Sequence, residues 1–242
     1  MTKVRFLMFL TALFIIPRIC ADELPDWFTP LRDAIYSQSH TSREIGVLYT
    51  AARERAGREL SGTALSIMLS RCEYMMGRSH YDEQNQRDAR TCFEKGMDYA
   101  EKALDVESSA EGWQMLADNL SYLCDVRSTG FLMTHGLKIE RYAKRALAID
   151  PGNTAAQFLI ASQYVYAPAP FHNYKKGLQM MEAIYANYEN RLYRDDRYNV
   201  YLAIGNAHYQ LNRKDEAKIW FVKALELYPE NKRAKKLIAE LM

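Results

Sequence analysis

The feature that most constrains the fold is a set of small and aromatic residues near the C-terminus, spaced as in two packed antiparallel helices. Gly205 and Ala217 fall where the two helices would cross, because a larger side chain there would push the backbones apart. Phe221 would fill the groove beside the crossing, and Pro229 would end the second helix because proline cannot continue the hydrogen-bond ladder. Residues 212–213 supply the turn between the helices. The remaining positions at matching spacing are Tyr201, Ile204, His208 and Ala224.

Weaker copies of this helix pair lie upstream. Residues 154–189 and 110–151 each predict a pair, and residues 60–108 predict a further pair whose register is less clear. Similar helix endings close three of the units, at residues 103–107, 146–151 and 224–229. A repeated supersecondary unit of this length indicates a solenoid, in which each pair buries its apolar face against its neighbours.

Glycine, proline and polar clusters mark the connections between these helices. The Ala-Pro-Ala-Pro-Phe segment at residues 167–171 predicts a lengthened turn inside one unit. Residues 128–136, which hold two glycines, predict a still longer connection inside the preceding unit. The polar residues 79–86 are expected to form a loop.

The spacing of large, small and aromatic residues matches the tetratricopeptide repeat. We therefore expect an all-α, right-handed solenoid of about four degenerate tetratricopeptide helix pairs with terminal capping helices. Residues 25–36 and 42–60 would cap one end, and the amphipathic segment 232–242 would cover the other. The approximate repeat boundaries are 60–108, 110–151, 154–189 and 198–231.

The N-terminus has the layout of a secretory signal peptide. Lys3 and Arg5 precede an apolar run at residues 6–16, and the small residue Ala21 precedes an acidic pair. The apolar run is too short to cross a bilayer as a helix. The sequence therefore predicts a signal peptide over residues 1–21.

Export would place the mature chain, a single helical-repeat domain over residues 22–242, in the periplasm. Two alternatives remain for its N-terminus: cleavage after Ala21, or acylation of Cys20 to give a membrane-anchored lipoprotein. No later segment is long and apolar enough to predict a transmembrane helix. A lipid anchor is therefore the expected form of any membrane attachment.

Composition and motifs argue against nucleic-acid binding and catalysis. The 32 basic and 30 acidic side chains are interspersed, whereas nucleic-acid binders concentrate basic charge on one face. The chain has no metal-binding, phosphate-binding or nucleophile motif, and no two of its five histidines share a helix face. We expect no enzymatic activity, no metal site and no cofactor.

Five other residues have structural explanations. Asp195 and Asp196 stand at a predicted helix start, where capping and the helix dipole favour carboxylates. The cysteines beyond Cys20 leave two alternatives open: Cys72, Cys92 and Cys124 are all small buried residues, or Cys72 and Cys92 form a disulfide.

Stacked helix pairs create a concave groove lined by their first helices, and this groove is the predicted binding site. The predicted lining is rich in tyrosine and amides and contains no Lys or Arg, which suits hydrogen bonding with aromatic packing. The candidate occupants are a protein partner and a small hydrophobic ligand. The lining positions are Gln114, Asp118, Tyr122, Phe158, Ser162, Tyr166, Asn199, Leu202, Asn206, Tyr209 and Gln210.

Through residues 161–171 and its last repeat, the chain resembles the T-component family of TRAP-associated bacterial transporters known from spirochaetes. The resemblance implies a periplasmic protein of four cryptic tetratricopeptide units that associates with a periplasmic solute-binding protein. A weaker likeness, carried by residues 142–147 and the last repeat, is to the eukaryotic regulators of microtubule dynamics. The predicted export signal favours the first family.

Two functional hypotheses follow. The first is a non-catalytic binding or adaptor protein that serves solute uptake. The second is a general scaffold for the assembly of envelope protein complexes. Ligand binding predicts that Phe131 and Phe171 fold over the groove, whereas a scaffold predicts an open concave face.

Overall fold

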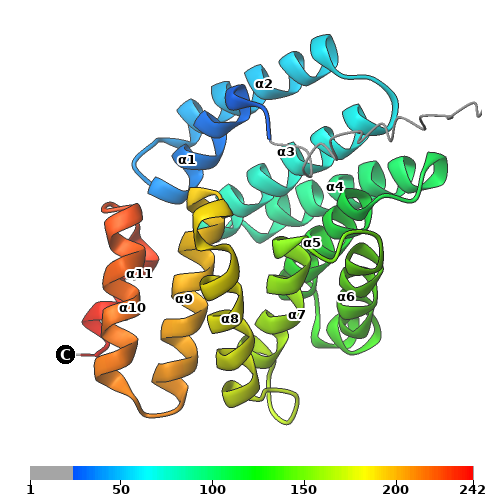
Figure 1. Ribbon diagram of the computed structural model, residues 1–242. Coiled ribbons are helices and arrows are strands. Elements are labelled where there is room, and N and C mark those ends of the chain that lie inside the picture. Colours follow the sequence, from blue (N-terminus) through cyan, green and yellow to red (C-terminus); the bar gives the residue numbers. More distant parts are fainter. Residues whose placement is uncertain (1–23, 242) are drawn as a thin grey trace, which may run out of the picture.

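The computed structural model describes residues 24–241, and within them it is built from helices without strands (Figure 1). The predicted signal peptide and Cys20 lie outside the described residues. The 3₁₀ helices are η1 (Asp26–Phe28) and η2 (Glu189–Arg191). The α-helices are α1 (Thr29–Ser37), α2 (Ser42–Glu59), α3 (Gly62–Asp82), α4 (Gln86–Val106), α5 (Ala110–Val126), α6 (Thr129–Ile149), α7 (Thr154–Tyr166), α8 (Tyr174–Tyr188), α9 (Arg194–Gln210), α10 (Lys214–Leu227) and α11 (Lys232–Ala239).

The predicted all-α solenoid is confirmed, because consecutive helices pack against each other along the chain. The closest associations are α3 with α4, α5 with α6, α7 with α8 and α9 with α10. In the last pair, Gly205 faces the ring of Phe221, and Ala217 and Ala224 are fully buried. These small residues let the two helices approach closely, as the sequence pattern indicated.

Side-chain caps explain where most of these helices begin. Thr41 accepts from the backbone of Glu44 while the Glu44 carboxylate accepts from the backbone of Thr41, which forms a capping box at α2. At six other helices, a Ser or Asn oxygen accepts a hydrogen bond from a backbone N–H in the first turn. These caps are Asn85, Ser109, Ser128, Asn153, Asn173 and Asn231.

Two predicted connections are shorter than expected, because the helices extend into them: only residues 83–85 and 127–128 are not helical. The polar residues 79–82 continue α3, and α6 begins directly after Ser128, whose hydroxyl accepts from the Phe131 N–H at 3.3 Å. His135 and Gly136 therefore lie within α6, where the imidazole stacks on the Phe131 ring with centroids 4.1 Å apart. Cap and packing contacts outweigh the weak helix propensity of glycine. The lengthened turn predicted at residues 167–171 is present between α7 and α8.

The N-terminal helix α1 does more than cover the first end of the stack. It contacts α9 and the segment before α11, so the two ends of the solenoid meet (Figure 1). The Asn231 amide donates to the Tyr36 carbonyl at 2.6 Å, and the Tyr228 hydroxyl donates to Asp33 at 2.8 Å. The Tyr36 and Tyr228 rings also stack, with centroids 5.6 Å apart. We call this set of contacts the ring closure.

The structure also bears on the cysteine pairing and on membrane-spanning helices. Cys72, Cys92 and Cys124 are free thiols, so the alternative of a disulfide between Cys72 and Cys92 is wrong. None of the described helices combines the length and apolar character that crossing a membrane requires.

Two glycine-to-alanine substitutions should change stability in opposite directions. A Cβ on Gly205 would overlap the Phe221 ring, which is 1% exposed, whereas a Cβ on exposed Gly57 in α2 meets no atom within 4 Å. Overpacking should make Gly205→Ala less stable by about 1–3 kcal/mol. Gly57→Ala should add about 0.5–1 kcal/mol, because alanine is the better helix former. Urea unfolding followed by circular dichroism measures both, and equal stabilisation of the two variants would contradict the packing described for α9 and α10.

Candidate functional site

The ring closure turns the predicted groove into a large cavity of about 1440 Å³. Its walls come mainly from α3, α5, α6, α7 and α9, with contributions from η1, α1, η2, α11 and the α7–α8 connection. Small-molecule sites usually measure about 300–1,000 Å³, so this cavity has room for an extended ligand.

Most of the predicted groove residues meet in this cavity. Asn206, Tyr209 and Gln210 do not line it, because they lie in the second half of α9, beyond the part that α1 covers. Asn206 instead donates to the Tyr166 hydroxyl at 3.2 Å and so supports the wall. The predicted residues that line the cavity are Gln114, Asp118, Tyr122, Phe158, Ser162, Tyr166, Asn199 and Leu202.

Of the two phenylalanines expected over the groove, only one lies at the cavity. Phe171 lines the cavity and is 57% exposed, so it lies at the opening. Phe131 instead packs into the helix core beside α5 and stacks on His135.

The sequence predicted a lining without Lys or Arg, and this is wrong. Arg32, Arg71, Arg78, Arg191 and Arg233 all line the cavity. The signal for two of them is visible in the sequence, because positions 71, 74, 78 and 81 alternate Arg and Tyr along one helical face. The register of this unit was too weak to assign its groove positions. Arg233 falls in the segment expected to face solvent as an end cap, and only the ring closure places it on the cavity wall.

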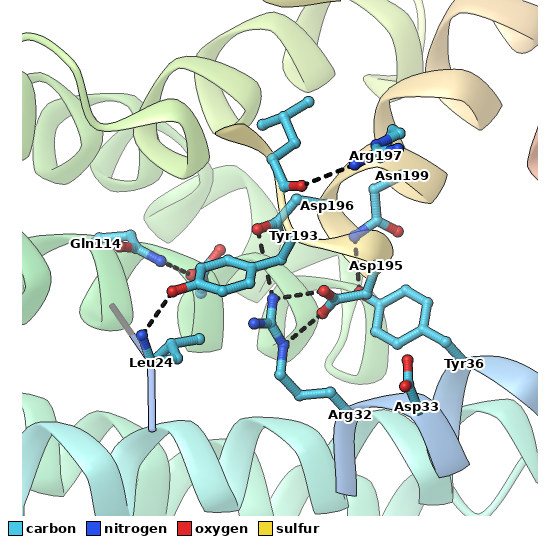
Figure 2. A network of polar contacts seen from close by, with 12 residues as sticks. Leu24, Arg32, Asp33, Tyr36, Gln114, Tyr193, Asp195, Asp196, Arg197 and Asn199 are labelled. Atoms are coloured by element: carbon cyan, nitrogen blue, oxygen red, sulfur yellow. Dashed lines mark hydrogen bonds and ion pairs between the residues drawn. The ribbon is translucent and has the colours of Figure 1, made fainter. Parts of the chain in front are cut away.

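Arg32 joins α1 to the start of α9 (Figure 2). Its guanidinium contacts both Asp195 oxygens, at 2.9 and 2.5 Å, and lies 3.4 Å from Asp196. It also lies 4.4 Å from the centre of the Tyr193 ring. Burial favours loss of the Arg32 proton, but attraction from Asp195 and Asp196 outweighs it and raises the pKa of Arg32. The two carboxylates therefore do more than the helix capping that the sequence suggested.

The other four cavity arginines have no carboxylate within 4.0 Å in the part of the chain that the structure describes. Arg78 is buried and donates to the Tyr36 hydroxyl, and its guanidinium lies 4.3 Å from the centre of the Tyr36 ring and 5.3 Å from that of Tyr122. Burial lowers the pKa of Arg71, and repulsion from Arg32 lowers it further by a smaller amount. The cavity therefore holds guanidinium groups that no carboxylate of the described residues pairs directly. Its lining also contains seven carboxyl groups, those of Glu111, Asp118, Asp125, Glu140, Asp150, Asp195 and Asp196.

Two cavity carboxyls titrate near neutral pH. Burial raises the pKa of Asp118 to about 6, although the hydrogen bond from Gln114 and attraction from Arg71 and Arg78 act in the opposite direction. Burial and then repulsion from Asp195 raise the pKa of Asp196 to about 7, against the attraction of Arg32. The Asp196 side chain is 32% exposed, but its exposed surface faces the cavity, whose walls surround it with protein. Both carboxyls gain negative charge as pH rises through 6–7.

Different helices supply the apolar part of the lining. The arginines come from α1, α3, η2 and α11, whereas α6, α7 and the connection after α7 contribute aliphatic and aromatic side chains. None of the five histidines lines the cavity. The described residues contain no group of three or more His, Cys, Asp or Glu placed to hold a metal ion. The apolar lining residues include Leu132, Met133, Leu137, Ile139, Phe158, Leu159 and Phe171.

Comparison with known proteins identifies the family. The family model described as regulator of microtubule dynamics protein 1-3 matches residues 32–242, which include α2 to α11 and most of α1. No curated protein matches the chain significantly. The expected membership of the TRAP T-component family is therefore wrong, and the match gives no evidence for tetratricopeptide repeats as such.

The error has a physical cause. Small residues at helix crossings and aromatic residues beside them report how paired helices pack, and unrelated functions share that packing. The second likeness, carried by residues 142–147 and the last helix pair, pointed to the family that matches. The chain belongs to the family of regulator of microtubule dynamics proteins 1-3.

Proposed function

We propose that this protein binds, without catalysis, an amphiphilic molecule that carries an anionic group and an apolar chain. The observation that carries the proposal is the set of Arg71, Arg78 and Arg233, which face one cavity without a carboxylate partner within 4.0 Å among the described residues. Arg78 is buried, Arg71 is half-buried, and Arg233 is exposed on the side that faces the cavity. A buried cation is costly unless an opposite charge and hydrogen bonds compensate for it. A bound anion would supply both, and its apolar chain would contact the lining from α6 and α7.

The scaffold alternative has less support. A scaffold for large partners needs an accessible concave face, whereas α1 and the ring closure cover this one. The cavity volume of about 1440 Å³ suits a chain-bearing small molecule better than a folded protein partner.

Three detergents with the same decyl chain test the proposal: decyl phosphate, decyl maltoside and decyltrimethylammonium. Each is titrated into the protein by calorimetry below its micelle concentration. Decyl phosphate should bind about tenfold or more tightly than the other two, because a charge-assisted hydrogen bond contributes about 1.5–3 kcal/mol. Equal affinity for all three would contradict the anion preference.

Single-arginine variants test which residues hold the anion. Arg71→Gln and Arg233→Gln should each weaken decyl phosphate binding by about tenfold to hundredfold, from the loss of one charge-assisted contact. Arg55→Gln is the matched control, because Arg55 is 51% exposed and pairs with Glu59 outside the cavity. Circular dichroism confirms that each variant is folded. Unchanged binding by both cavity variants would refute the assigned site.

The family match supports a second candidate function, an effect on microtubules, because it includes nearly all of the described helical domain. Cosedimentation with assembled microtubules, with and without decyl phosphate, tests it. Export of the chain remains a prediction from residues 1–21, and sequencing the N-terminus of the mature protein tests that prediction.

A further inference from the structure

We propose that the surface around the cavity opening docks on an anionic membrane. This surface, the apolar rim, consists of Met133 and Leu137 on α6 and Phe171 in the α7–α8 connection. The inference extends the proposed function, since it identifies where an amphiphile would enter the cavity. The rim and the arginines belong to different elements, so the two can fail separately.

The rim residues are exposed although they are among the most apolar side chains of their segments. Met133 is 62% exposed, Leu137 73% and Phe171 57%. All three also line the cavity, so we place them at its opening; Leu137 in addition borders a shallow outer groove along α6. Exposed apolar residues that cluster at one site indicate an interaction surface, whereas single ones are common on any protein. In Figure 1 the connection that carries Phe171 projects from the lower edge of the molecule.

Charge around the rim is more basic than acidic. Residues 127–140 and 163–182 carry four Lys or Arg and two Glu, and one of the two, Glu140, pairs with Lys144 at 2.8 Å. Among the four, Arg127 pairs with Glu94, and Lys176 donates to the Tyr164 hydroxyl. Lys138 and Lys175 lie near the exposed apolar residues in sequence, Lys138 beside Leu137 and Lys175 four residues after Phe171. Apolar side chains next to basic ones match an anionic lipid surface, which attracts cations and accepts inserted side chains.

A bilayer explains why the rim surrounds an opening. An apolar chain that leaves a bilayer through this rim would pass from lipid to the apolar lining of α6 and α7 without crossing water. A protein partner would bury the rim but would not require it to lie at the cavity. The other large aliphatic residues that are exposed among the described residues do not line the cavity: Val47, Val106, Ile149, Ile219 and Val222.

Flotation with vesicles tests the proposal. The protein is mixed with vesicles of phosphatidylcholine alone or phosphatidylcholine with phosphatidylserine, and the bound fraction is measured after density centrifugation. The wild-type chain should float with the phosphatidylserine vesicles, and added salt should weaken its binding. Met133→Asp/Leu137→Asp and Phe171→Asp should each reduce the partition coefficient about tenfold or more, because a charge replaces inserted apolar surface. Val106→Asp, 76% exposed in the wild type, and Ile219→Asp, 57% exposed, are the matched controls and should bind as the wild type does.

Decyl phosphate binding in the absence of vesicles separates this proposal from the function on which it rests. Rim variants that no longer float but still bind decyl phosphate would support docking through the rim. Arg233→Gln that no longer binds decyl phosphate but floats like the wild type would support both the anion site in the cavity and the separate docking surface at the rim. Rim variants that float like the wild type would overturn the proposal, and so would equal flotation with both vesicle types. Failure of the wild type to float, combined with rim-dependent binding to microtubules, would reassign the surface to an acidic protein.

Discussion

Replacing Arg32 with Met should lower the free energy of unfolding by about 3–5 kcal/mol, the usual cost of removing one partner from a buried ion pair. The side chains of Arg32 and Asp195 are 7% and 4% exposed, so water cannot take the place of the lost guanidinium. The contact joins α1 to α9 across 163 positions of the sequence, and its loss also weakens the ring closure. Urea unfolding followed by circular dichroism measures the change.

Two further variants separate a buried charge from a general effect of losing an arginine. Arg55→Met removes an exposed pair, with Arg55 51% and Glu59 45% exposed, and should change stability by less than about 1 kcal/mol. Arg32→Met/Asp195→Asn removes the uncompensated carboxylate together with the cation and should recover part of the loss. A loss in Arg32→Met no larger than that in Arg55→Met would show that the pair does not hold the ring closed.

Anion binding should become about tenfold weaker as pH rises from 5 to 8, since an interaction that shifts a pKa by one unit changes an affinity by about tenfold. Asp118 and Asp196, with pKa values of about 6 and 7, are largely protonated at the lower pH and charged at the higher. Once charged, they repel the ligand and attract the arginines that would hold it. Decanesulfonate is the suitable probe, because its own charge does not change over this range, and calorimetric titration gives the affinity.

Asp118→Asn and Asp196→Asn should each flatten this pH profile, because an amide carries no charge at any pH in the range. Burial also raises the pKa of Asp125, which lines the same cavity, so the double variant should keep a smaller residual slope. An affinity that is constant or rises with pH in the wild type would refute the proposed electrostatics. The raised pKa of Asp196 also means that the stability it contributes when protonated is lost as pH rises through about 7.

Local pattern was sufficient to predict the paired helices. Small residues such as Gly205 and Ala217 report a close crossing directly, because only a missing side chain permits it. The helix boundaries were harder to predict, as α6 shows. Gly136 is a weak helix former, but the Ser128 cap and the stacking of His135 on Phe131 stabilise the helix on its N-terminal side, so that it continues past Gly136. Eight of the predicted groove positions line the cavity, because each follows from its own helix face.

The composition of the cavity depended on tertiary structure. Arg32 and Arg233 lie near opposite ends of the chain, and no periodicity within a helix indicates that they share a site. They meet because Tyr36 stacks on Tyr228 and Asn231 bonds to the Tyr36 carbonyl, contacts between residues more than 190 positions apart. The sequence by itself determined that helices pair and stack, since that depends on neighbours a few residues apart. Closure of the stack into a charged cavity depends on long-range packing of its two ends, which only the tertiary structure decided.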